Sequence, residues 1–128
     1  MFKRIVVGLG KSKTGQLAAE RAAALATALG ATLHVVTAFK PGQKDSACDR
    51  TEAERLLASF AAGQLCKVDS DALPGDPVRA ILQVAAESNA DLIVVGNKGM
   101  RGAGRLLGSV PNSVTHKAPC SVLVVKTT

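Results

Sequence analysis

Aromatic residues are nearly absent from this chain, which has three Phe and no Trp or Tyr among 128 residues. Domains that bind single-stranded nucleic acid stack bases on aromatic rings, so this shortage counts against that class of function. Acidic residues are also in deficit, because 10 Asp and Glu stand against 16 Lys and Arg. The resulting positive charge is compatible with a phosphate-bearing partner but does not select one.

Cysteine and long apolar runs are scarce as well. Cys48, Cys66 and Cys120 are widely spaced and His34 lies far from His116, so no group has the spacing of a metal site. No apolar stretch approaches the length of a membrane span, and the start of the chain holds too short an apolar stretch for a secretory signal. We therefore expect a protein of the reducing cytoplasm, without a structural zinc ion and without a membrane segment.

The sequence does contain a regular alternation of strand and helix signals. Its length predicts one domain, residues 1–128. The expected strands are residues 2–8, 32–38, 66–73, 91–95 and 121–125, and the expected helices are residues 14–29, 49–62, a helix starting at Asp76–Pro77, and 109–117. This alternation predicts an α/β fold with a doubly wound, five-stranded parallel sheet and helices on both faces. Residues 66–73 are polar, which predicts an edge strand.

Helix ends and helix faces carry more specific expectations. Thr14 is expected to cap the first helix and Gly30 to end it. Asp76 and Ser109 are expected to cap the third and fourth helices. The expected apolar side of the first helix comprises Leu17, Ala18, Arg21, Leu25 and Leu29.

Ligands of an open parallel sheet bind beyond the carboxyl ends of the strands, where the strand order reverses. One segment there is Gly8–Gly15, in which Gly10-Lys11-Ser12 looks like the end of a P-loop. The leading glycine of that motif would fall at Ile5, inside the strand, so the segment is not a P-loop. The dinucleotide fingerprint also fails, because Lys13 occupies the place of its third glycine. By itself this segment is typical of a solvated turn.

The second segment, Gly96–Ser109, is rich in glycines and cations. It holds five of the twelve glycines, together with Lys98, Arg101 and Arg105 and no acidic residue. Glycines let backbone N–H groups approach a phosphate, and the helix that follows adds free N–H groups and a positive dipole end. The segment therefore predicts a site for a polyphosphate or another anion. The alternative is a surface loop whose glycines only make turns.

Several stretches together carry a family resemblance. They are Gly75-Asp76-Pro77, Asp91-Leu92-Ile93-Val94-Val95-Gly96-Asn97-Lys98-Gly99-Met100, Gly108-Ser109-Val110-Pro111-Asn112-Ser113-Val114 and Ala118-Pro119-Cys120. With them, nearly the whole chain resembles the universal stress protein (UspA) family, small α/β domains of the adenine-nucleotide-binding type. The nucleotide-binding branch of that family carries a G-2x-G-9x-G-S/T loop, which Gly96, Gly99 and Gly108-Ser109 match.

The resemblance implies the strand order 3-2-1-4-5 and ATP or another adenine nucleotide between the ends of the first and fourth strands. It also implies a homodimer joined through the last strand, Ser121 to Val125. The implied phosphate contacts are Gly96, Asn97, Lys98, Gly99, Arg101, Gly108 and Ser109, and the other expected binding residues are Leu9, Gly10, Ala38, Met100 and Val110.

Two departures from the family pattern bear on the ligand. Only eight residues separate Gly99 from Gly108, one fewer than the nine of the family loop. Gly10 stands where nucleotide-binding members carry an Asp, so a carboxylate that could meet the ribose or help to hold Mg²⁺ is missing. Both departures count against Mg-ATP in the pose usual for the family. A phosphate-rich or cyclic nucleotide bound without metal is the alternative.

We therefore expect a cytoplasmic stress-response protein that binds an adenine nucleotide, with ATP as the first choice, and that is regulatory rather than strongly catalytic. No general base stands out near the glycine-rich segment, so at most a weak ATPase is expected. The alternatives are a cyclic-AMP-binding member of the family and a dimerisation module that binds no nucleotide. No recognition motif supports a nucleic-acid partner.

Overall fold

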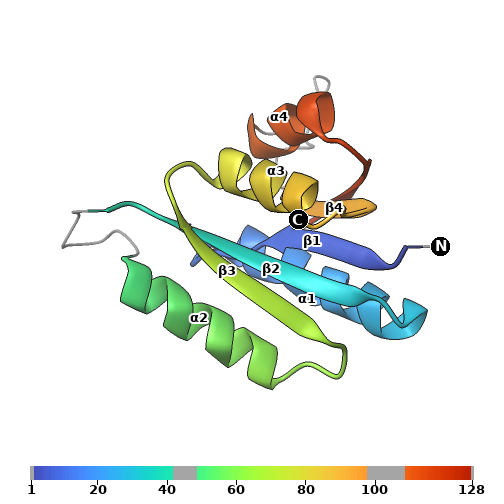
Figure 1. Cartoon of the computed structure of the whole chain (residues 1–128), viewed down its shortest axis with the longest axis horizontal. Helices are drawn as coiled ribbons and strands as arrows, with labels where there is room; N and C mark the ends of the chain where they lie inside the picture. The colour runs from blue at the N-terminus through green and yellow to red at the C-terminus, as the bar shows by residue number, and fades with distance from the viewer. Residues whose placement is uncertain (1, 42–48, 98–108, 128) are drawn as a thin grey trace.

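The computed structural model describes residues 2–41, 49–97 and 109–127. These residues form a five-stranded parallel sheet in the order β3-β2-β1-β4-β5 (Figure 1). The strands are β1 (Arg4–Gly8), β2 (Thr32–Phe39), β3 (Val68–Pro74), β4 (Leu92–Asn97) and β5 (Ser121–Lys126). The predicted α/β class and the strand order implied by the family resemblance are both confirmed.

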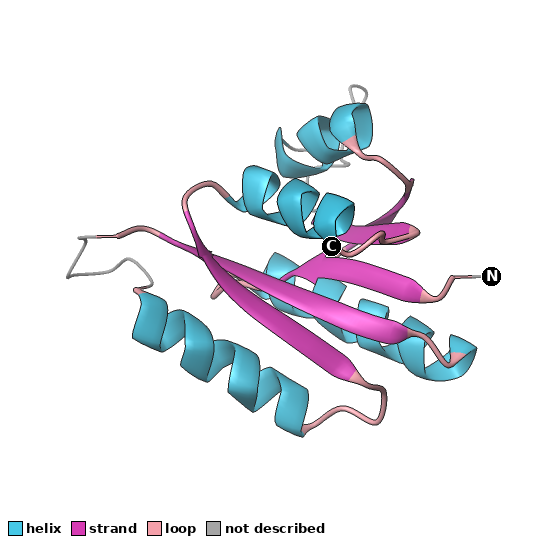
Figure 2. Cartoon of the chain, viewed as in Figure 1, coloured by secondary structure: helices cyan, strands magenta, loops and turns pink. Residues whose placement is uncertain are grey.

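Within the described residues, four helices cover the two faces of the sheet (Figure 2). They are α1 (Lys13–Leu29), α2 (Arg50–Ala62), α3 (Pro77–Glu87) and α4 (Ser109–Lys117). Successive residues of a strand point to opposite faces, so Ile5 and Val7 join the core under α1 and α2, and Val6 joins the core under α3 and α4. Both faces of β1 and β4 are thereby buried, which is why these strands read as continuous apolar runs.

Helix α1 differs from the prediction at its start and on its buried face. Ser12 is the N-cap, and its Oγ accepts a hydrogen bond from the N–H of Gly15 at 3.1 Å; the expectation that Thr14 caps the helix is wrong. Leu29 is 46% exposed. The buried side consists of Ala18, Ala19, Ala22, Ala23 and Ala26. Such small side chains let the helix axis approach the sheet closely. The predicted face is correct only in part, since Ala18 is buried and Leu25 packs against the core, whereas Arg21 and Leu29 are exposed.

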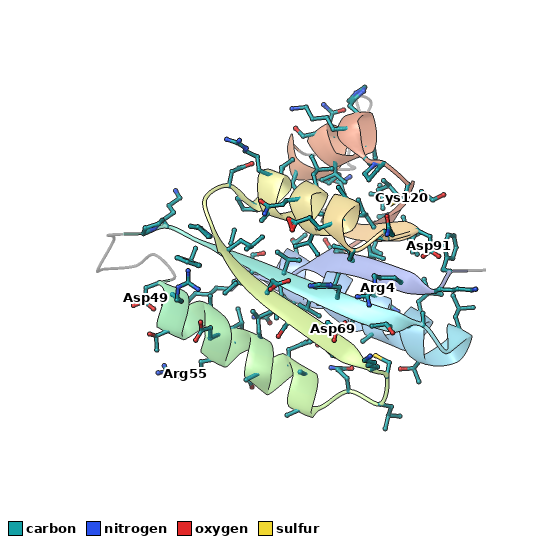
Figure 3. The ribbon with its side chains drawn as sticks, viewed as in Figure 1. Arg4, Asp49, Arg55, Asp69, Asp91 and Cys120 are labelled. Atoms are coloured by element: carbon teal, nitrogen blue, oxygen red, sulfur yellow. The ribbon has the colours of Figure 1, made fainter. Side chains whose placement is uncertain are left out.

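Strand β3 is the edge strand that its polar sequence predicts, although it covers 68–74 rather than 66–73. Its carboxylates contact side chains of β1 and β2, and Figure 3 labels one such pair, Asp69 and Arg4. Asp69 accepts from Nη1 of Arg4 at 3.1 Å, and Asp71 lies 2.7 Å from Nε2 of His34. Arg4 also contacts Nδ1 of His34 at 3.3 Å. These contacts tie the edge strand to β1 and β2.

Asp91 fixes the amino end of β4 to the start of the chain. Its carboxylate accepts hydrogen bonds from the backbone N–H groups of Lys3 and Arg4, at 2.8 and 3.1 Å. Partial burial raises the pKa of Asp91, but these N–H groups and its own outweigh that effect, so the pKa lies below the ordinary value of 3.8. Burial and the nearby Asp91 charge raise the pKa of Cys120, which lies at the same end of the sheet (Figure 3).

Candidate functional site

A cavity of about 260 Å³ opens at the carboxyl ends of β1 and β4. These strands are neighbours, but the chain leaves β1 toward β2 on one side and reaches β4 on the other, so the strand order reverses here. Such a switch point is where open α/β sheets bind ligands. The described wall comprises Gly8, Leu9, Gly10, Ser12, Thr14, Gly15, Ala18, Val36, Ala38, Pro77, Ile81, Val94, Val95, Gly96 and Val110.

Two glycines allow helices to close on the strand ends. A Cβ at Gly8 would lie 2.8 Å from Cδ1 of Ile81 in α3. A Cβ at Gly96 would lie 2.9 Å from both the carbonyl oxygen and Cγ2 of Thr14 in α1. The cavity therefore owes its side walls to the absence of side chains at the ends of β1 and β4.

The first turns of two helices contribute to the cavity. Ser12, Thr14 and Gly15 come from the start of α1, and Pro77 is the first residue of α3. Neither first turn contains an acidic residue, and the carboxylate of Asp76, the N-cap of α3, accepts from the N–H of Arg79 at 3.2 Å. Helix N-termini carry unpaired N–H groups and a partial positive charge, so this geometry favours an anionic ligand.

The loop from β1 to α1 is held firmly against β2. The N–H of Leu9 donates to the carbonyl oxygen of Val36 at 2.8 Å, and the buried hydroxyl of Thr37 donates to the carbonyl oxygen of Leu9 at 2.9 Å. The side chains of Leu9 and Ala38 are thereby fixed in the wall, which presents mainly apolar surface. A preformed apolar wall suits the flat ring of a base.

The cations beside Gly10 do not add charge to the described wall. Nζ of Lys11 pairs with the carboxylate of Glu52 in α2 at 2.9 Å, and Lys13 does not line the cavity. The wall contains no Asp or Glu, and nowhere in residues 2–41, 49–97 and 109–127 do three His, Cys, Asp or Glu side chains gather to hold a metal ion. Within the same residues no helix is long and apolar enough to cross a membrane.

The structure brings together five of the predicted binding residues, since Leu9, Gly10, Ala38, Gly96 and Val110 all line the cavity. The other predicted positions are placed differently. Asn97 is buried at the end of β4 and does not line the described wall, and Ser109 is the first residue of α4, with its side chain outside the described part. Lys98, Gly99, Met100, Arg101 and Gly108 lie outside the described residues, so their roles stay predictions.

Sequence reasoning missed the contributions of the helices to this wall. Ser12 and Thr14 belong to a segment interpreted as a solvated turn, and Pro77 and Ile81 were expected only as a helix start and as part of an apolar helix face. A signal was present, because helices that follow parallel strands begin at the carboxyl edge of the sheet, where the ligand site also lies.

Comparison with known proteins identifies the family. The model of the universal stress protein family matches residues 1–126. The chain belongs to the universal stress protein family. Universal stress protein Rv1636 of Mycobacterium tuberculosis is 35% identical, over 99% of this chain and 98% of the relative. A universal stress protein of Thermus aquaticus is 39% identical, over 98% of this chain and all of the relative.

Solved structures agree with this assignment. A universal stress protein crystallised in complex with cAMP superimposes with a TM-score of 0.79 at 33% identity, covering 99% of this chain and 98% of that one. The universal stress protein of Archaeoglobus fulgidus in complex with dAMP gives a TM-score of 0.73 at 27% identity, covering 98% of both chains. The present protein thus shares its fold and most of its length with other universal stress proteins.

Proposed function

We propose that this universal stress protein binds an adenine nucleotide in the cavity at the ends of β1 and β4, and that it acts by binding rather than by catalysis. The observation that carries the proposal is a mainly apolar cavity at the switch point of the sheet, flanked by the N-termini of α1 and α3. The apolar wall suits a base and ribose, and the helix ends suit phosphate oxygens. The cAMP and dAMP complexes of two relatives support this choice, since both ligands are adenine nucleotides.

We take ATP as the leading ligand, with the glycine-rich segment Gly96–Ser109 holding its phosphates. Neither the described wall nor the sequence of residues 98–108 contains a carboxylate. The protein therefore offers no acidic ligand for Mg²⁺ at this site, and any bound Mg²⁺ would depend on the phosphates of the nucleotide. A carboxylate that could act as general base is also missing from this wall, so we expect at most a weak ATPase.

Cyclic AMP is the second candidate ligand. A relative with 33% identity and near-complete coverage was solved with it. Cyclic AMP carries a single phosphate charge and needs no metal, which fits a wall without carboxylates.

A homodimer through β5 belongs to the same proposal, because the family resemblance implies it. Location in the cytoplasm stays a prediction from the cysteine content.

The proposal is tested by isothermal titration calorimetry of ATP, AMP and cAMP against the native protein and the Gly108→Leu variant. The native protein is expected to bind at least one of them. The variant is expected to lose binding, because a bulky side chain would displace the phosphate from the backbone, while its circular dichroism spectrum stays native. Gly63→Leu, at the end of α2 with no atom closer than 3.8 Å to a new Cβ, is the matched control and should bind as the native protein does. Unchanged affinity in Gly108→Leu would contradict the assignment.

A further inference from the structure

A second hollow, of about 620 Å³, lies between α3 and α4. Its walls carry three residues from each helix, namely Val78, Arg79 and Leu82 from α3, and Val110, Ser113 and Lys117 from α4. We call it the α3–α4 groove. On α4 these positions are spaced three and four residues apart, so they form one face of the helix. Seven residues of α helix span about 10 Å, which gives the groove an elongated form.

The α3–α4 groove joins an apolar floor to a cationic rim. Val78, Leu82 and Val110 are half-buried, whereas Arg79 and Lys117 are exposed. Asp76 is the one acidic residue in the described lining, and its carboxylate accepts from the backbone N–H of Arg79. Within the part of the chain that the structure describes, neither cation makes an ion pair, unlike Arg4, Lys11 and Arg50. The groove therefore favours a ligand with both apolar surface and negative charge.

The groove and the cavity share one wall. Val110 lines both, and Pro77, which lines the cavity, stands between two residues that line the groove, Asp76 and Val78. A ligand held in the cavity could thus continue past the first turn of α3 into the groove. It would meet Arg79 near the shared end and Lys117 at the far end.

We propose that the α3–α4 groove is a second subsite, which takes the distal half of a dinucleoside polyphosphate whose first adenosine occupies the cavity. This inference rests on the proposed function, because the cavity supplies the anchor. The second nucleoside packs on Val78, Leu82 and Val110, and the phosphate chain pairs with Arg79 and Lys117. A bare mononucleotide would leave this apolar floor uncovered.

Calorimetry with diadenosine tetraphosphate, adenosine tetraphosphate and ATP tests the inference. Diadenosine tetraphosphate is expected to bind roughly tenfold more tightly than ATP, the size of effect that two exposed charge pairs and a packed base can supply. It should also bind more tightly than adenosine tetraphosphate, which has the same number of phosphates but lacks the second base. The advantage over ATP should shrink between low and physiological salt, because exposed ion pairs are screened. In the double variant R79Q/K117Q the advantage over ATP should fall by a factor of about three, because only the contact of the second base remains, while ATP keeps its native affinity.

Arg55 in α2 provides the matched control, because it is an exposed arginine on the opposite side of the molecule (Figure 3). R55Q should keep the full advantage. Equal affinity of the native protein for diadenosine tetraphosphate and adenosine tetraphosphate would overturn the second subsite, as would an advantage over ATP that is undiminished in R79Q/K117Q. Failure of ATP, AMP and cAMP alike to bind would instead overturn the proposed function itself, so the two failures are distinguishable.

Discussion

At the residue scale, two glycines at the rim of the cavity have opposite surroundings. A Cβ at Gly96 would lie 2.9 Å from the carbonyl oxygen of Thr14 and 3.2 Å from Cγ2 of Thr127. A Cβ at Gly10 would meet nothing within 4 Å, and its φ is not positive. Packing therefore requires glycine at position 96, whereas position 10 has room for a side chain.

This contrast predicts different effects on stability. Gly96→Ala should lower the free energy of unfolding by about 1–3 kcal/mol, because the new methyl group is forced against backbone that cannot move aside cheaply. Gly10→Ala should stay within about 0.5 kcal/mol of the native protein. Urea denaturation of both variants makes the comparison, and equal stabilities would show that α1 does not press on β4 as described.

Gly10 also offers a test of the ligand chemistry. Gly10→Asp should weaken binding of ATP in the absence of metal, because a carboxylate would then stand in the wall near the phosphates. Added Mg²⁺ should restore part of that loss, since the cation can bridge the carboxylate and the phosphates. Gly10→Asn has nearly the same shape without the charge and should bind as the native protein does. An identical response of the Asp and Asn variants would contradict an electrostatic effect.

Some residues of the site were predicted from the sequence, whereas the N-cap of α1 was not. Leu9, Gly10 and Ala38 were predicted at the site through the family resemblance, and all three line the cavity. Ser12 and Thr14 are two residues apart and carry similar hydroxyl groups, so composition could not decide which caps α1. The choice depends on the path of the loop, which the hydrogen bonds of Leu9 and Thr37 fix.

At the scale of elements, the amino ends of β1 and β4 are joined by one carboxylate. Because the pKa of Asp91 is lowered in the folded protein, its ionised form stabilises the fold above the ordinary pKa, and this contribution disappears as pH falls through the folded pKa. Asp91→Asn should therefore melt below the native protein at pH 7, with a gap in Tm that closes below about pH 4. Thermal melts of both proteins across pH measure this gap, and a gap independent of pH would refute the role of the charge.

The elements themselves were largely predictable, and their faces were less so. Gly30 ends α1 with a φ of 67°, and Asp76 followed by Pro77 starts α3, as the residue types indicate. The buried face of α1 was predicted only in part, because a hydrophobicity pattern favours leucines over alanines. Ala18 and Leu25 contact the core as expected, but the buried residues Ala19, Ala22, Ala23 and Ala26 were missed. The many alanines of this helix did predict that it packs close to the sheet, and five of them lie in the core.

At the scale of the whole molecule, the two edges of the sheet differ. Edge strand β3 carries the carboxylates of Asp69 and Asp71, and charged side chains on an edge strand discourage further strand pairing. Strand β5 instead presents Leu123, whose side chain is 42% exposed. This apolar edge fits the homodimer that we propose through β5.

The dimer is tested by Leu123→Asp, which places a charge in the middle of the proposed interface. The variant should elute as a monomer in size-exclusion chromatography with light scattering, because burying an unpaired carboxylate is costly. Leu65→Asp is the matched control, since Leu65 is 92% exposed in the segment between α2 and β3 and should leave the native assembly unchanged. If the native protein is itself a monomer in this measurement, β5 is not a dimer interface.

Two kinds of information in the sequence predicted the overall topology. Hydrophobic periodicity predicted the alternation of strands and helices, but the strand order came from the family resemblance, since periodicity does not say which strands are neighbours. The location of the cavity then follows from the strand order. Its walls could not be predicted, because they depend on the close contacts of Gly8 with Ile81 and of Gly96 with Thr14.

The central claim, that the cavity between β1 and β4 holds an adenine nucleotide, is tested most directly by the Tm of the purified protein with saturating nucleotide. ATP would be measured with and without Mg²⁺, beside AMP and cAMP. A ligand at about 100 times its Kd stabilises the folded state by about 2.7 kcal/mol, which gives an easily measured rise. We predict a rise with ATP that does not require Mg²⁺, and a rise with cAMP alone would select the second candidate. An unchanged Tm with all of these ligands would contradict the account and leave dimerisation without nucleotide as the function to pursue.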